Sequence, residues 1–130
     1  MSKSQLIIKV STLREAITEF QDIWKRHAKG EKLDTPIETL RFENTFMLMK
    51  TLTPKRLELL QKLHEIGKIS IRALAKKLAR EYSNVHQDVK ALHRVVLILQ
   101  DKVGKYYVPW DSILTEIPLC TEKKFHHHIH

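Results

Sequence analysis

The chain is poor in cysteine and glycine and has no long apolar run. Its single cysteine, Cys120, excludes an intramolecular disulfide and a cysteine-based zinc ribbon, and we expect it to be a half-buried apolar residue. The apolar segment at residues 6–8 is too short for a membrane span or for the core of a signal peptide. We therefore expect a cytoplasmic protein without a membrane partner.

Catalytic signatures are also absent. Three scattered glycines leave no Gly-rich phosphate loop, and neither a Gly-x-Ser-x-Gly nor a His-Glu-x-x-His motif occurs. Of eight histidines, four fall in the last five residues, and the others form no spaced cluster of metal ligands. We expect no enzyme activity, no cofactor and no metal site, and we treat residues 120–130 as a His-rich tail outside the folded part.

Acidic residues are in the minority. Lys and Arg number 23 against 15 Asp and Glu, which gives a net charge of +8 and a pI near 9.7. Such an excess suits a polyanionic partner, because each cation that neutralises a phosphate releases a condensed counterion. The charge alone is equally consistent with a basic but otherwise ordinary surface.

Residues 1–52 are expected to form an N-terminal strand-helix extension that serves dimerisation or partner binding. The pattern predicts a strand at 5–10, a helix from Thr12 to Gly30, a strand at 37–42 and a short helix at 44–52. Thr12 and Glu15 have the spacing of a capping box. Apolar residues at helical spacing form a stripe that could cover the second half of the chain or pack against its twin in a dimer: Leu13, Ala16, Ile17, Phe20, Ile23, Trp24 and Ala28.

Residues 53–119 have clearer helix and turn signals. Thr53-Pro54 starts a helix that Gly67 ends, with its inward face formed by Leu57, Leu60, Leu63 and Ile66. A short strand at 69–71 follows, with Ser70 also capping a helix at 71–79, and Ser83 caps a third helix that runs to Val96. Residues 98–102 and 105–108 flank a Val103-Gly104 turn and predict a hairpin, with a last strand at 111–119. This order predicts an α+β fold, mainly α: a winged helix-turn-helix with an N-terminal strand-helix extension.

The third of these helices has two distinct faces. Steps of 100° per residue gather an inward apolar stripe of Val85, Val89, Leu92 and Val96. The opposite face is polar and basic, and Asp88 is expected to lie off it, paired with Arg72 or Lys76. Amides can read adenine edges and cations can hold phosphates. We expect the DNA contacts to come from Arg72, Ser83, Asn84, His86, Gln87, Lys90, Arg94, Lys102 and Lys105.

The stretch from Leu52 to Leu119 resembles the small prokaryotic MarR-like winged-helix regulators, a group of DNA-binding and antitoxin-type proteins. The resemblance rests on LTPKRLELL (52–60), SIRALAKKLAREYSNVHQDVKAL (70–92) and YYVPWDSI (106–113), and the N-terminal LIIKVSTLREA (6–16) also fits. It implies a dimeric transcriptional regulator in which Ser83, Asn84, His86, Gln87 and Lys90 face DNA.

The chain departs from this group in three places. Ser83 and Gln87 stand where relatives tend to have basic residues, and Ala73 replaces the acid of a capping box after Ser70. The glycine that usually ends the recognition helix is absent from Val95-Val96-Leu97. A β-branched residue is poorly suited to a left-handed cap, so we expect this helix to continue or to end differently.

We expect a homodimeric, sequence-specific regulator of transcription, acting as a repressor, that binds double-stranded DNA. Each protomer would place residues 83–96 in one major groove of a roughly palindromic operator. One alternative is an antitoxin-type protein that neutralises a toxin partner and autoregulates its operon. Another is a winged helix used only for protein contacts, which predicts no salt-dependent affinity for DNA.

Overall fold

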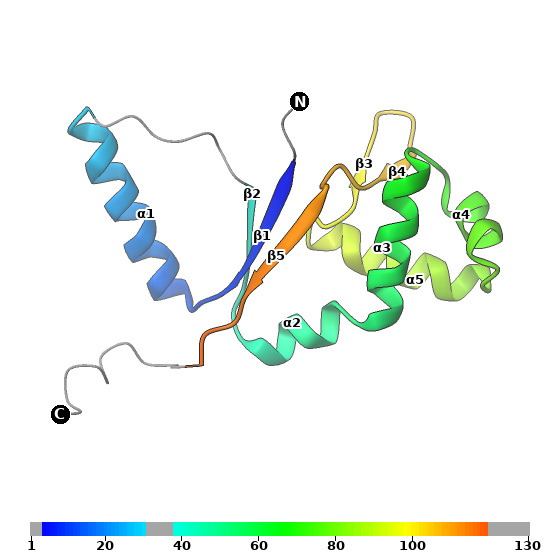
Figure 1. Ribbon diagram of the computed structural model, residues 1–130, viewed down its shortest axis with the longest axis horizontal. Helices are drawn as coiled ribbons and strands as arrows, with labels where there is room; N and C mark the ends of the chain where they lie inside the picture. The colour runs from blue at the N-terminus through cyan, green and yellow to red at the C-terminus, as the bar shows by residue number, and fades with distance from the viewer. Residues whose placement is uncertain (1–3, 31–37, 120–130) are drawn as a thin grey trace.

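The computed structural model describes residues 4–30 and 38–119, and these form an α+β fold with five helices and two small sheets. A three-stranded sheet stands in the middle of Figure 1, helix α1 lies on one side of it, and helices α3 to α5 gather on the other side. One continuous apolar core joins the sheet to these helices, from Leu6 and Ile8 to Leu97 and Ile98. The expected tail at 120–130, with Cys120, lies outside the described residues.

The three-stranded sheet is entirely parallel and has the strand order β2-β1-β5. Strand β1 (Gln5–Val10) pairs on one side with β2 (Glu38–Phe42) and on the other with β5 (Ser112–Glu116). The sequence predicted all three strands but not their pairing. Strand β5 thus returns from the end of the chain to the strands of the N-terminal segment, and the Asp111 amide donates to the Ser4 carbonyl oxygen at 2.6 Å beside it.

Helix α1 (Leu13–Ala28) has the predicted start, because both hydrogen bonds of the Thr12–Glu15 capping box are present. None of its residues is buried. It is attached to the sheet through Glu19, whose carboxylate contacts Arg41 of β2 and lies 3.1 Å from Nζ of Lys9 in β1. Its apolar stripe therefore does not cover the second half of the chain, which was one of the two arrangements expected from the sequence.

The ion pairs of Glu19 generate a pH prediction. Partial burial would raise the pKa of Glu19, but hydrogen bonds and charge from Lys9 and Arg41 outweigh it and lower the pKa below 4.5. A lowered folded-state pKa means that the stabilisation is complete above pH 4.5 and is lost as the pH falls through the folded value. Urea unfolding of Glu19→Gln and of the unchanged chain should differ at pH 7 and converge in acid; a constant difference would contradict this.

Four helices and a hairpin follow the second strand. They are α2 (Thr45–Thr51), α3 (Pro54–Ile66), α4 (Ile71–Leu78), α5 (Tyr82–Arg94), β3 (Leu99–Gln100) and β4 (Tyr106–Tyr107). Asn44, Thr53 and Ser70 cap the first three helices, each by accepting from the backbone N–H three residues on. The predicted strand at 69–71 is reduced to a single antiparallel bridge between Ile69 and Tyr106. This bridge places Ile69 beside strand β4 of the β3–β4 hairpin.

Three local expectations are wrong. Leu57 is 39% exposed, and Leu59 fills the core from α3 in its place. Helix α5 begins at Tyr82 with Glu81 as its N-cap, so Ser83 lies in the first turn and caps nothing. The same helix ends at Arg94, and Val96 is 54% exposed rather than part of the inward stripe.

The helix ends at Arg94 because Val96 adopts the left-handed conformation that the sequence argued against, with a φ of 70°. Its N–H donates to the His93 carbonyl and the Leu97 N–H donates to the Leu92 carbonyl, the two bonds of a Schellman motif. A left-handed residue with a Cβ costs about 1–2 kcal/mol. Fully burying Leu97 and Ile98, both 0% exposed, contributes about 1.5–3 kcal/mol each, so core packing outweighs the strain.

Replacing Val96 by glycine should therefore stabilise the protein. Glycine adopts a positive φ without a Cβ clash but loses more backbone entropy on folding, so the expected net gain is about 0.5–1 kcal/mol in the free energy of unfolding. Urea denaturation of Val96→Gly and Val96→Ala measures it, with alanine expected to gain less because it keeps the Cβ. A Val96→Gly variant less stable than the unchanged chain would contradict the strain argument.

Candidate nucleic-acid interface

Helix α5 turns one face to the core and the other to solvent. Val85, Val89 and Leu92 are all 0% exposed, as the helical projection predicted. The expected contact residues on the other side are exposed apart from the half-buried His86: Ser83, Asn84, Gln87, Lys90 and Arg94. The predicted division of this helix into a buried stripe and a polar face is confirmed.

Arg72 joins this surface from helix α4 through an aromatic contact. Its guanidinium lies 5.0 Å from the ring centroid of Tyr82, and the Tyr82 ring lies 5.7 Å from that of His86. Sequence reasoning missed Tyr82 because it placed the helix start at Ser83. With the helix starting at Tyr82, residues 82 and 86 are four apart and must share a face, which is the signal that could have found the contact. The cluster fixes an exposed cation beside the first turn of α5.

Helices α4 and α5 are joined by a tight three-residue connection, 79–81. Ala79 has a φ of 56°, its N–H donates to the Lys76 carbonyl and the next N–H, of Arg80, donates to the Ala75 carbonyl. This is a second Schellman ending with a non-glycine residue in the left-handed position. The chain turns there into the extended backbone of Glu81, which is the N-cap of α5.

Asp88 is the only acid in α5, and it faces inward rather than toward the exposed polar face. Arg56 Nε lies 3.0 Å from one of its carboxylate oxygens and an Arg80 terminal nitrogen lies 2.8 Å from the other. Arg56 also donates to the Thr51 carbonyl oxygen at 3.0 Å, at the end of α2. The three side chains are 15–21% exposed, so solvent screens the pairs only in part.

The expectation that Asp88 lies off the polar face is confirmed, but the expected partners were wrong. Arg72 is engaged with Tyr82 instead, and no ion pair of Lys76 occurs in the described part of the chain. Arg56 comes from α3, thirty-two residues before Asp88, so the contact between the two depends on the tertiary fold and not on local spacing. Arg80 lies in the connection between α4 and α5, directly after Ala79, whose left-handed conformation turns the chain.

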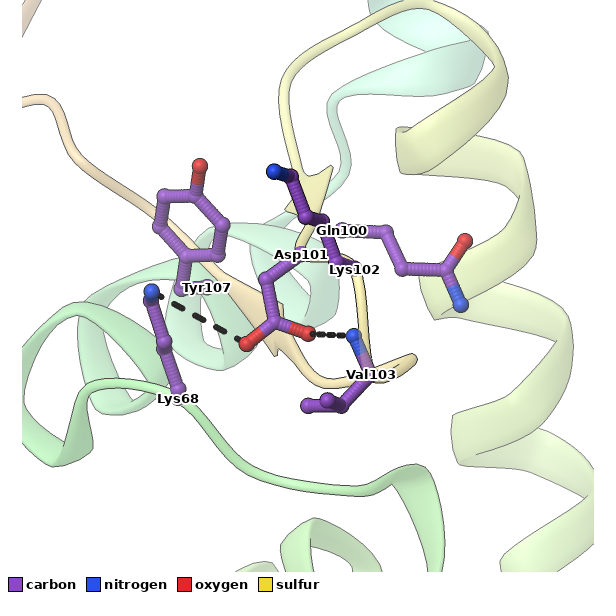
Figure 2. Close-up of a pocket in the computed structure, with 6 residues that line it drawn as sticks. All are labelled: Lys68, Gln100, Asp101, Lys102, Val103 and Tyr107. Atoms are coloured by element: carbon purple, nitrogen blue, oxygen red, sulfur yellow. Dashed lines mark hydrogen bonds and ion pairs between the residues drawn. The ribbon is translucent and has the colours of Figure 1, made fainter.

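Lys102 and Lys105 lie at the tip of the hairpin, as predicted, and both are exposed. Asp101 organises this tip, because its Oδ1 accepts from the amides of Val103 and Lys105 at 3.0 and 2.8 Å. Figure 2 shows Lys68 and Val103 on opposite sides of the Asp101 carboxylate, with the Lys68 ammonium 3.8 Å from Oδ2. Lys68 also lies over the Tyr107 ring at 5.2 Å. Lys68 and Tyr107, which the sequence did not indicate, therefore lie next to Asp101 at the start of the hairpin turn.

The exposed face of α5 and the hairpin tip carry more positive than negative charge. Across residues 4–30 and 38–119, the cations of the exposed α5 face and of the hairpin tip make no ion pairs: Lys90, Arg94, Lys102 and Lys105. The nearby acids are Asp88 and Asp101, each engaged by cations of its own, and the exposed Glu81 at the start of α5. The face therefore has excess positive charge available to a polyanion.

Two other kinds of site have no basis in the described residues. Nowhere in ranges 4–30 and 38–119 do three or more His, Cys, Asp or Glu side chains group in a way that could hold a metal ion, and the terminal histidines lie outside these ranges. No helix there is long and apolar enough to cross a membrane.

A family model named HVO_A0114 matches residues 51–115, which is half of the chain. The chain belongs to the HVO_A0114 family. The region matched in this family contains α3, α4, α5, the hairpin and most of β5, and therefore all the residues of the candidate interface. Searches of curated proteins and of solved structures returned no match.

Asp88→Asn tests the contacts behind the polar face. The amide keeps the shape but loses the charge, which leaves two guanidinium groups without an acid, so we expect the free energy of unfolding to fall by about 2–4 kcal/mol. Asp22→Asn is the matched control, because Asp22 also pairs with an arginine, at 3.5 Å, but is 69% exposed. It should change stability by about 0.5 kcal/mol or less. The free energies of unfolding are measured by urea denaturation. Equal losses in the two variants would show that the ion pairs of Asp88 stabilise the protein no more than an exposed pair does.

Proposed function

We propose that the protein is a sequence-specific, double-stranded-DNA-binding regulator of transcription that acts as a repressor through a winged helix-turn-helix. Helices α3, α4 and α5 form the three-helix part, α5 is the recognition helix, and the β3–β4 hairpin is the wing. Repression follows from occupation of a promoter by the bound protein.

The observation that carries the proposal is the composition of the exposed α5 face. It presents amides and cations with no carboxylate, while the one acid of the helix is held behind it by Arg56 and Arg80. Asn84 and Gln87 can pair with an adenine edge through two hydrogen bonds, which gives sequence preference. Lys90 and Arg94 supply phosphate contacts, which give affinity without sequence preference.

The hairpin supports the same function. Its tip extends two exposed lysines, and the Asp101 turn fixes the backbone between them, so little ordering is needed when they meet phosphates. Arg72 adds a further cation that the Tyr82 ring holds beside the start of α5. The helix N-terminus itself contributes a positive dipole end. The antitoxin-type alternative would use the N-terminal strand and helix or the strand at 111–119, so it does not compete for these residues.

Two substitutions separate base reading from phosphate binding. Gln87→Ala should lower affinity for the DNA upstream of the protein's own gene by about 5–100-fold and leave binding to random duplex nearly unchanged. Lys90→Ala should weaken both and reduce the slope of log affinity against log salt by about 1. Fluorescence anisotropy on both duplexes at several salt concentrations measures each quantity.

Lys50→Ala is the matched control, because it removes the same charge from α2, where Lys50 lies 5.9 Å from the Phe46 ring centroid. It should leave the salt slope unchanged. Equal losses on upstream and random DNA for Gln87→Ala would refute the base-reading role. Binding that is weak and independent of salt in the unchanged chain would refute DNA binding altogether.

A further inference from the structure

Four residues of the apolar stripe of helix α1 are largely exposed in the described chain. Leu13, Phe20 and Trp24 are 72%, 65% and 63% exposed, and Ile17 is 48% exposed. Figure 1 shows α1 apart from helices α3 to α5, with its whole length on the far side of the sheet. The helix meets the sheet through Glu19, which lies on a different side of the helix from these four residues.

The spacing of the stripe fits a helical partner. Residues 13, 17, 20 and 24 are separated by four, three and four positions, the pattern of a two-helix seam that repeats every 3.5 residues. A groove for an extended peptide or a flat surface needs no such repeat. A second helix could pack its own side chains between these four.

A second copy of α1 is complementary to the first when the two run antiparallel. If Ile17 faces the partner's Phe20, then Leu13 faces the partner's Trp24, so each aliphatic side chain meets an aromatic one. A parallel pair would instead stack Trp24 against the partner's Trp24 and Leu13 against the partner's Leu13. Antiparallel packing therefore balances the volumes along the whole seam.

The charges of α1 favour the same direction. Its first ten residues contain three acids, of which Glu19 is engaged by the sheet, and one base, whereas its last turn is basic, with Lys25, Arg26 and His27. Two antiparallel copies bring the acidic half of each beside the basic half of the other, and their helix dipoles oppose. Each exposed pair contributes little, so the charges select the direction more than they supply affinity.

The area is sufficient for a stable dimer. Fully buried Phe and Trp side chains account for about 150–250 Å² each, so the four exposed side chains offer on the order of 400 Å² of apolar surface per protomer. An interface of standard size buries about 800 Å² per partner, a little more than half of it apolar. Two copies of this stripe would thus supply most of the apolar part.

We propose that α1 is the self-association surface of the protein, and that two copies pair antiparallel through Leu13, Ile17, Phe20 and Trp24. This inference rests on α1 alone and is independent of the proposed DNA binding. A two-fold pair of this kind also leaves α5 and the hairpin of each protomer free, because they lie on the other side of the sheet (Figure 1).

Sedimentation or light scattering of the full chain over a micromolar concentration range tests the surface. We expect a species of twice the 15.3 kDa chain mass. Phe20→Glu should raise the dimer dissociation constant at least about 100-fold, because it buries a charge in the seam. Phe46→Glu is the matched control: Phe46 is an equally exposed aromatic, 70%, on α2, and the substitution should not change the mass.

Trp24→Ala gives a second, neutral test of the same seam and should also weaken the dimer, and circular dichroism should show that each variant keeps its helices. A chain that stays monomeric throughout the range would overturn the proposal and point to a different protein as the partner of α1. A dimer that survives Phe20→Glu, or that dissociates equally with Phe46→Glu, would overturn it as well.

Spin labels at Lys25→Cys, in a Cys120→Ser background, test the direction of the pair. With the seam centred between residues 18 and 19 and a rise of 1.5 Å per residue, the two labels should lie about 20 Å apart along the antiparallel helices. Parallel helices would bring them within about 10 Å, the interaxial distance of packed helices. A distance in the shorter range would overturn the antiparallel arrangement.

Discussion

Asp88 extends from the recognition-helix candidate to two guanidinium groups that belong to different parts of the chain, Arg56 in α3 and Arg80 in the connection after α4. Arg56 carries the contact on to the Thr51 carbonyl at the end of α2. These few polar atoms fix where α5 lies against the helices before it. They also keep the only carboxylate of α5 away from its solvent-exposed face. The Asp88 ion pairs therefore determine both the position of α5 and the positive charge of that face.

The two ends of α5 are set by backbone strain that core packing offsets. Ala79 and Val96 both adopt a left-handed conformation without being glycine. The first turns the chain sharply into α5, and the second sends Leu97 and Ile98 into the core, where Trp110 Nε1 donates to the Leu97 carbonyl oxygen at 3.0 Å. The hairpin therefore starts from a fixed point beside the helix. Its position relative to α5 depends on a residue that local propensity alone would not choose.

Local signals in the sequence predicted most elements of the fold, because caps and apolar spacing act within a few residues. Thr12, Thr53 and Ser70 cap helices as expected, and the buried stripe of Val85, Val89 and Leu92 follows from the helical period. Beyond the local errors at Leu57 and at the start of α5, the sequence missed contacts that local spacing cannot encode. The β1–β5 pairing joins strands about a hundred residues apart and the β1–β2 pairing joins strands about thirty residues apart, while the arginine partners of Asp88 depend on tertiary packing. The left-handed Val96 was missed because burial of its two neighbours outweighs its own preference.

The most direct test of the proposed DNA binding is an NMR titration of the full chain with a duplex from upstream of its own gene, followed through backbone amide shifts. DNA binding through α5 and the hairpin should produce large shifts at residues 82–90 and 102–105, with little change in α1. Shifts confined to α1 and the sheet, or no shifts at all at low salt, would contradict the assignment of α5 as the recognition helix.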